Sequence, residues 1–177
     1  MLRSLDGASP RVHPTAFVSE AAYVVGDVEI GEGASIWPGV VIRADMGKMT
    51  IGKHTSIQDN SVLHGDADVV IGERVVIGHM VLCHARKIGD RVLLGSGATV
   101  NEGVEIGDDS LVASGGVVAD FVKVPPRSLV VGVPGKVRGE VKDRHTKLIA
   151  ELCESYIKKT ERYNRQGNLE SAADAQP

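Results

Sequence analysis

Residues 88–118 read IGDRVLLGSGATVNEGVEIGDDSLVASGGVV, and an aliphatic residue returns at every sixth position. These positions are Ile88, Leu94, Val100, Ile106, Val112 and Val118. Small or β-branched residues follow four places on, at Val92, Ala98, Val104 and Ser110. Two inward positions in every six residues, with glycine and polar residues between them, favour short strands joined by tight turns over helices. The segment therefore predicts a β-solenoid in which three hexads make one coil of about 18 residues.

The same period extends over most of the chain, from about residue 12 to residue 136. It predicts about six coils, which begin at Val12, Ile30, Ile51, Ile71, Ile88 and Ile106. The stretch VPPRSLVVGVPGKV, residues 124–137, ends the pattern with proline and glycine. From about Asp143 apolar residues recur at spacings of three and four, which indicates one amphipathic helix. We therefore expect a solenoid domain over residues 1–137, a C-terminal helix over 138–166 and a flexible tail over 167–177.

Composition excludes several classes of partner. The formal net charge is -3 and only 3% of the 177 residues are aromatic, so no basic or base-stacking surface for nucleic acid is expected. No stretch approaches the roughly 18 apolar residues of a membrane span, and the first residues show no apolar targeting segment. We expect a cytoplasmic protein without a membrane partner. Cys83 and Cys153 are interpreted as free thiols, with Cys83 in an inward core position.

Hexads of unusual length all fall on the third face of the predicted solenoid. They are IRADMGKMT (42–50), LHGDADVV (63–70) and CHARK (83–87), with nine, eight and five residues. Their second residues, Arg43, His64 and His84, follow an inward aliphatic residue and form one outward column. His64 and His84 then lie one coil apart, at the strand spacing of about 4.8 Å, close enough to share a metal ion.

His79 lies on the second face, across a corner from His84, so one chain cannot readily bring all three histidines to a point. If the three act together, the pattern requires a closed threefold assembly in which His79 of one chain faces His64 and His84 of the next. Gln58 and Asp59 precede His79 by one coil on the second face. The alternative for any single one of these histidines is an ordinary solvated side chain. His13, His54 and His145 fall outside this column and are assigned no metal role.

The motifs IRAD at 42–45, IQDNSVLH at 57–64 and IGHMVLCH at 77–84 resemble those of the γ-class carbonic anhydrases. The resemblance implies a left-handed parallel β-helix with a C-terminal α-helix, assembled as a homotrimer with the metal between subunits. It implies a zinc-type site, with Fe²⁺ or Co²⁺ as alternatives, bound by His64 and His84 of one subunit and His79 of the next. It further implies an interface network of Arg43, Asp45 and Asp59, and a Gln58 side chain that hydrogen-bonds the metal-bound solvent.

The activity implied by this resemblance is a lyase reaction, the reversible hydration of carbon dioxide to bicarbonate by a metal-bound hydroxide. One departure from the family pattern is the short loop HGDADVV at 64–70, which carries only Asp66 and Asp68 where longer members have an acidic proton shuttle. The alternative functions are a metal-dependent thioesterase, a hexapeptide-repeat acyltransferase acting on acyl-CoA, and a trimeric scaffold without metal. The helix tyrosines Tyr156 and Tyr163 are candidates for a place over the site.

Overall fold

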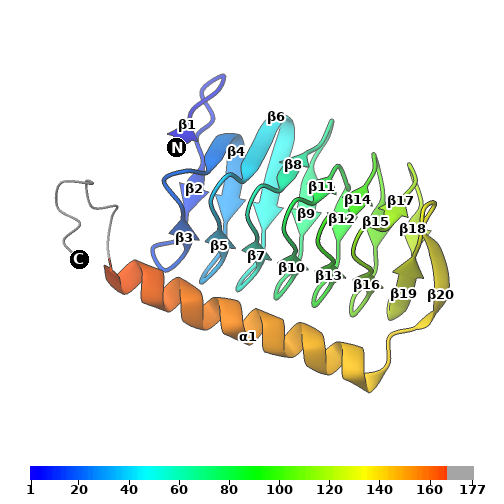
Figure 1. Cartoon of the computed structure of the whole chain (residues 1–177). Helices are drawn as coiled ribbons and strands as arrows, with labels where there is room; N and C mark the ends of the chain where they lie inside the picture. The colour runs from blue at the N-terminus through cyan, green and yellow to red at the C-terminus, as the bar shows by residue number, and fades with distance from the viewer. Residues whose placement is uncertain (167–177) are drawn as a thin grey trace.

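The computed structural model describes residues 1–166, and the tail predicted for 167–177 lies outside the described residues. The chain forms a β-solenoid of about seven turns, with one long helix running beside it (Figure 1). This confirms the predicted fold class. The extra turn lies at the C-terminal end, where β18 (Lys123–Val124) and β19 (Ser128–Val131) stack in parallel on β15 (Glu105–Ile106) and β16 (Leu111–Val112). At the N-terminal end, strand β1 (Leu2–Arg3) pairs in parallel with β4 (Tyr23–Ile30).

Short parallel strands build the three faces of the solenoid. The first face holds β2 (Arg11–Val12), the ends of β4 (Tyr23–Ile30) and β6 (Val41–Ile51), β9 (Val69–Ile71), β12 (Lys87–Ile88), β15 (Glu105–Ile106) and β18 (Lys123–Val124). The second face holds β3 (Phe17–Val18), β5 (Ser35–Ile36), β7 (Ser56–Ile57), β10 (Val76–Ile77), β13 (Leu93–Leu94), β16 (Leu111–Val112) and β19 (Ser128–Val131). The third face holds the starts of β4 and β6, then β8 (Val62–His64), β11 (Leu82–Cys83), β14 (Thr99–Val100) and β17 (Val117–Val118).

The aliphatic residues of the six-residue period fill the interior, as predicted. Ile57 is 0% exposed, Leu63 1% and Cys83 2%. Equivalent residues of successive coils pair in register, for example Ile77 with Leu94 and Leu94 with Val112. Because each inward residue stacks on its equivalent in the next coil, the core is one continuous column rather than a set of separate layers.

Helix α1 (Asp143–Gln166) packs along the second face. Its buried residues Ile149 and Cys153 join Val76, Leu93 and other side chains of that face in a second apolar cluster. Towards its C-terminal end, Tyr156 and Tyr163 both pack edge-on against Trp37, with ring centroids 5.4 and 5.1 Å apart. Residues 136–140, partly within the segment that the sequence assigned to the helix domain, form strand β20 (Lys136–Glu140) antiparallel to β19. The turn containing Pro134 and Gly135 reverses the chain before the helix begins at Asp143.

Among the residues described, no helix combines the length and apolar character needed to cross a membrane.

Candidate metal centre

His64 and His84 are brought together by the strand register of the third face. Leu63 of β8 pairs with Cys83 of β11, so the residues that follow them project side by side. The two imidazole rings stack with centroids 5.0 Å apart and an interplanar angle of 27°. The predicted column is therefore present, and its third member, Arg43, pairs in register with His64.

Asp45 anchors the ring of His64. The extended hexad of residues 42–50 continues as strand β6 over 11 residues, which carries Asp45 back over His64. Nε2 of His64 donates to Oδ1 of Asp45 at 2.9 Å, and the Arg43 guanidinium donates to the other oxygen of Asp45. Burial opposes ionisation of Asp45, but the bond from His64, the backbone and Arg43 together hold the pKa of its carboxyl below the ordinary value.

His84 has a buried nitrogen with no hydrogen-bond partner. Its Nε2 is shielded from solvent, and Oδ2 of Asp66 lies 3.6 Å away, beyond hydrogen-bond distance. A buried polar atom left unpaired costs about 1–3 kcal/mol, so such atoms are rare unless another group completes their bonding. His54 Nδ1 is the other such atom in residues 1–166, but its ring lies against Gly33 and outside any group of potential metal ligands found there.

Asp66 adds an oxygen donor that sequence analysis did not include among the ligands. Ligand atoms of His64, Asp66 and His84 all lie within 4.8 Å of one another. Imidazole nitrogens with a carboxylate oxygen are a donor set that zinc accepts, so the residues present fit a divalent metal. The position of Asp66 two residues after His64 is the sequence signal that keeps it near that histidine, whereas its approach to His84 depends on the path of loop 65–69.

His79 belongs to a separate cluster on the second face. Nδ1 of His79 lies 3.0 Å from Oδ2 of Asp59, and both side chains are substantially exposed, at 46% and 40%. Gln58, 5% exposed, donates its backbone amide to Ile77 O, which places it one coil from His79. His79 is absent from the group that contains His64 and His84 in the described part of one chain.

The predicted site residues thus fall into two clusters. We call Arg43, Asp45, His64, Asp66 and His84 the corner half-site, and Gln58, Asp59 and His79 the face half-site. Of the two tyrosines predicted near the site, Tyr156 lies within electrostatic range of the face half-site. Burial and, to a smaller extent, the charge of Asp59 raise the pKa of its hydroxyl.

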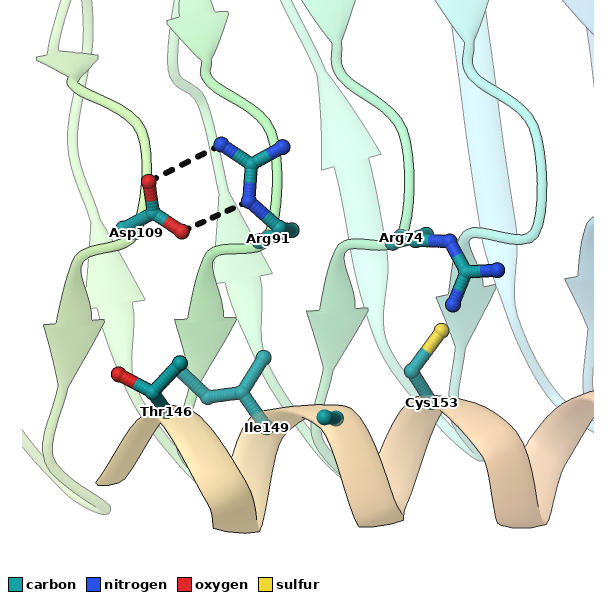
Figure 2. A pocket seen from close by; sticks show the side chains of 7 residues that line it. Arg74, Arg91, Asp109, Thr146, Ile149 and Cys153 are labelled. Atoms are coloured by element: carbon teal, nitrogen blue, oxygen red, sulfur yellow. Dashed lines mark hydrogen bonds and ion pairs between the residues drawn. The ribbon is translucent and has the colours of Figure 1, made fainter. Parts of the chain in front are cut away.

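A cavity of about 360 Å³ opens beside the corner half-site. We call it the corner cavity, and it is lined by residues 65–69, 84–86, 102, 103, 105, 121 and 123. A smaller cavity of about 90 Å³ lies under helix α1 (Figure 2), where Arg91 binds both carboxylate oxygens of Asp109 at 2.7 and 3.0 Å. The smaller cavity lies against the second face and the helix and shares no residue with the corner half-site.

The chain is similar over most of its length to proteins named carbonic anhydrase. The chain is 47% identical over 146 residues to a protein of Methanocaldococcus jannaschii named "Probable carbonic anhydrase", covering 81% of this chain and 92% of that protein. It is 38% identical over 177 residues to the "Carbonic anhydrase" of Geobacillus kaustophilus, covering 98% of this chain and 97% of the relative.

A solved structure and a family model match as well. The structure is a hexapeptide transferase family protein from Anaplasma phagocytophilum, 34% identical, with a TM-score of 0.88. The alignment covers 92% of this chain and 97% of that one. Residues 87–120 match the model described as bacterial transferase hexapeptide (six repeats). The chain therefore belongs to the hexapeptide-repeat family of γ-class carbonic anhydrase-like proteins.

Proposed function

We propose that this protein is a metal-dependent carbonic anhydrase that hydrates carbon dioxide reversibly to bicarbonate at a zinc-type site between subunits. The observation that carries the proposal is the stacked pair His64 and His84, in which the buried Nε2 of His84 has no hydrogen-bond partner. Two imidazoles at this separation provide two of the three protein ligands typical of a catalytic zinc site. The names of the relatives support carbon dioxide as substrate.

The third ligand in this proposal is His79 of a neighbouring subunit in a homotrimer. Support comes from the surface beside each half-site. Val62 and Leu82 pair in register on the third face and are 36% and 47% exposed, each two residues before a corner histidine. Met80, 65% exposed, stands next to His79. Exposed apolar side chains next to both half-sites are typical of a protein contact. In the proposed assembly, three such heterologous contacts between the two clusters close into a ring with C3 symmetry.

The donor set determines the chemistry. Three neutral imidazoles leave the ion its full charge and an open position, and zinc held in this way lowers the pKa of bound water to about 7, which supplies a nucleophile at neutral pH. Histidine ligands also accept Fe²⁺ or Co²⁺.

Other residues of the two half-sites orient the reacting groups. Asp45 accepts a hydrogen bond from His64, and Asp59 lies within ion-pair distance of His79. Carboxylates in these positions fix the orientation of the ring and increase its basicity. The buried, uncharged Gln58 amide would orient the attacking hydroxide without neutralising its charge. Arg43, 48% exposed, pairs with Asp45 and stands at the proposed contact, where its planar guanidinium suits a carboxylate of the neighbour.

A second candidate is acyl-CoA chemistry, as a thioesterase or acyltransferase. The observation that favours it is the corner cavity, whose volume of about 360 Å³ lies in the range of small-molecule pockets rather than that of a triatomic gas. An acyltransferase needs one histidine base and no metal. A requirement for metal therefore distinguishes a carbonic anhydrase or a thioesterase from an acyltransferase. The preferred substrate, carbon dioxide or a thioester, distinguishes the carbonic anhydrase from the thioesterase.

The test is stopped-flow hydration of carbon dioxide by the zinc-loaded protein and by the His84→Ala variant. We expect activity in the wild type and a loss of at least about a hundredfold in the variant. Removal of a metal ligand weakens zinc binding, and without zinc the site has no activated water to serve as nucleophile. The exposed His13 gives the matched control, and His13→Ala should keep full activity. A wild type that binds zinc fully yet hydrates no carbon dioxide would contradict the proposal.

A further inference from the structure

Hydration of carbon dioxide produces a proton as well as bicarbonate, and this proton must leave the site in every turnover. We propose that Glu102 is the proton-relay residue of this protein. The inference rests on the proposed function and assigns a role to a residue outside both half-sites.

Glu102 lies one coil above the corner half-site. The backbone amide of His84 donates to Val100 O at 2.8 Å, and that of Arg86 donates to Val104 O at 2.9 Å. The turn around Glu102 therefore runs directly over the segment that carries His84. Glu102 lines the corner cavity together with His84 and Asp66, so one space connects the three side chains.

The Glu102 carboxylate is free to accept a proton, whereas its neighbours are engaged. Glu105 pairs with Lys123 at 3.2 Å, and Asp68 accepts a hydrogen bond from the backbone of Lys48 at 2.9 Å. Within residues 1–166, no ion pair or hydrogen bond occupies the Glu102 side chain. Because a relay must exchange its proton in each cycle, the unpaired carboxylate suits the role better than the paired ones.

The turn that carries Glu102 is held in place. Phe121 donates its backbone amide to Glu102 O at 2.7 Å. Its ring lies so close to Gly103 that a Cβ on this glycine would stand 2.4 Å from the ring, and Gly103 has a φ of +67°. The backbone is therefore fixed, while the exposed side chain keeps the freedom to move between the cavity and solvent.

The charge of the cavity favours departure of a proton. Its ionisable side chains other than His84 are four carboxylates and two cations: Asp66, Asp68, Glu102, Glu105, Arg86 and Lys123. The excess of negative charge attracts cationic proton carriers and disfavours anionic ones. In the proposed step, the water that attacks carbon dioxide loses a proton to a carboxylate oxygen of Glu102. Bicarbonate leaves, and the neutral Glu102 passes the proton to a buffer base, which restores the carboxylate.

The test compares Glu102→Gln with Glu105→Gln, a substitution of the same kind in the same cavity. Carbon dioxide hydration by the zinc-loaded trimer is measured at low buffer and at high imidazole, with kcat and kcat/KM determined separately. Proton transfer limits kcat at low buffer, so Glu102→Gln should lose about tenfold in kcat there, with Asp66 left as a poorer acceptor. Its kcat/KM should be unchanged, and high imidazole should restore kcat. Glu105→Gln should change kcat by less than about twofold.

The outcomes separate this inference from the proposed function. An active wild type with an unaltered kcat in Glu102→Gln at low buffer overturns the relay alone. An equal loss of kcat and kcat/KM without rescue by imidazole assigns Glu102 a structural role and overturns the relay as well. A zinc-loaded wild type without hydration activity overturns the proposed function and, because the relay rests on that function, the relay as well.

Discussion

The rings of His64 and His84 stack 5.0 Å apart, although a full turn of the solenoid separates them in the chain. The spacing follows from the parallel register of β8 and β11, which pairs Leu63 with Cys83 and sets the next two residues side by side. A backbone repeat thus places two imidazole side chains together without any dedicated loop. The irregular hexads on either side then add Asp45 and Asp66 around the pair.

The first prediction concerns the carboxylate behind His64. Asp45→Asn removes the acceptor that orients the ring, and loss of such a partner typically weakens metal binding by about 10- to 100-fold. We expect a decrease of this size in zinc affinity, measured by competition with a chelating dye. Asp27→Asn, which removes a comparable partner of Arg11 elsewhere on the surface, should bind zinc like the wild type. Unchanged affinity in Asp45→Asn would show that the ring is oriented by other contacts.

The second prediction concerns the exposed apolar pair on the third face. Leu82→Glu places a charge in the proposed contact between subunits, where an unpaired charge costs about 3 kcal/mol or more. Sedimentation velocity should therefore show dissociation to smaller species, together with a loss of bound zinc. Val70→Glu is the matched control, because Val70 is 46% exposed but lies on the first face. A Leu82→Glu trimer that persists at low concentration would place the subunit contact elsewhere.

The third prediction concerns the thiol of Cys83, which lies in the sequence between His79 and His84. Burial raises the pKa of Cys83 to about 11, against about 8.5 for a free thiol. At pH 8 the folded protein therefore holds Cys83 as a neutral thiol, and its reaction with a disulfide reagent should be at least about a hundredfold slower than in guanidinium. Since the unfolded chain loses this proton first, the free energy of unfolding should fall as the pH rises above about 8.5. Rapid modification of Cys83 in the folded protein would refute its position in the core.

The solenoid and the corner column could be predicted from the sequence, because both depend on a backbone period. A residue such as Leu63 or Cys83 is assigned inward by its place in the hexad alone, and His64 and His84 follow from the same count. The proximity of Asp66 to His84 depends on how a shortened loop turns, and hexad counting carries no information about that path. The edge-on packing of Tyr156 and Tyr163 on Trp37 could not be predicted from the sequence either. The helical period shows which side chains face the solenoid but not where along the solenoid they lie.

The origin of the third metal ligand distinguishes two versions of the centre. In the intersubunit version it is His79 of a neighbour, and His79→Ala should empty the site while Asp66→Asn leaves zinc bound. In a centre within one chain the third ligand is Asp66, whose oxygen lies within 4.8 Å of the ligand nitrogens of both histidines. Asp66→Asn should then empty the site, and His79→Ala should leave zinc bound. Zinc per chain, measured on both variants, separates the two versions.

The most direct measurement is zinc content in mixed trimers of His79→Ala and His84→Ala chains, produced together in equal amounts. Each variant alone should bind no zinc. In the mixture, a His79→Ala chain still offers His64 and His84, and an adjacent His84→Ala chain still offers His79, so about a quarter of the sites should fill again. A mixture of His64→Ala and His84→Ala is the control, because every site lacks a corner histidine and should stay empty. Full zinc binding by His79→Ala alone, or no recovery in the mixed trimers, would contradict a metal centre shared between subunits.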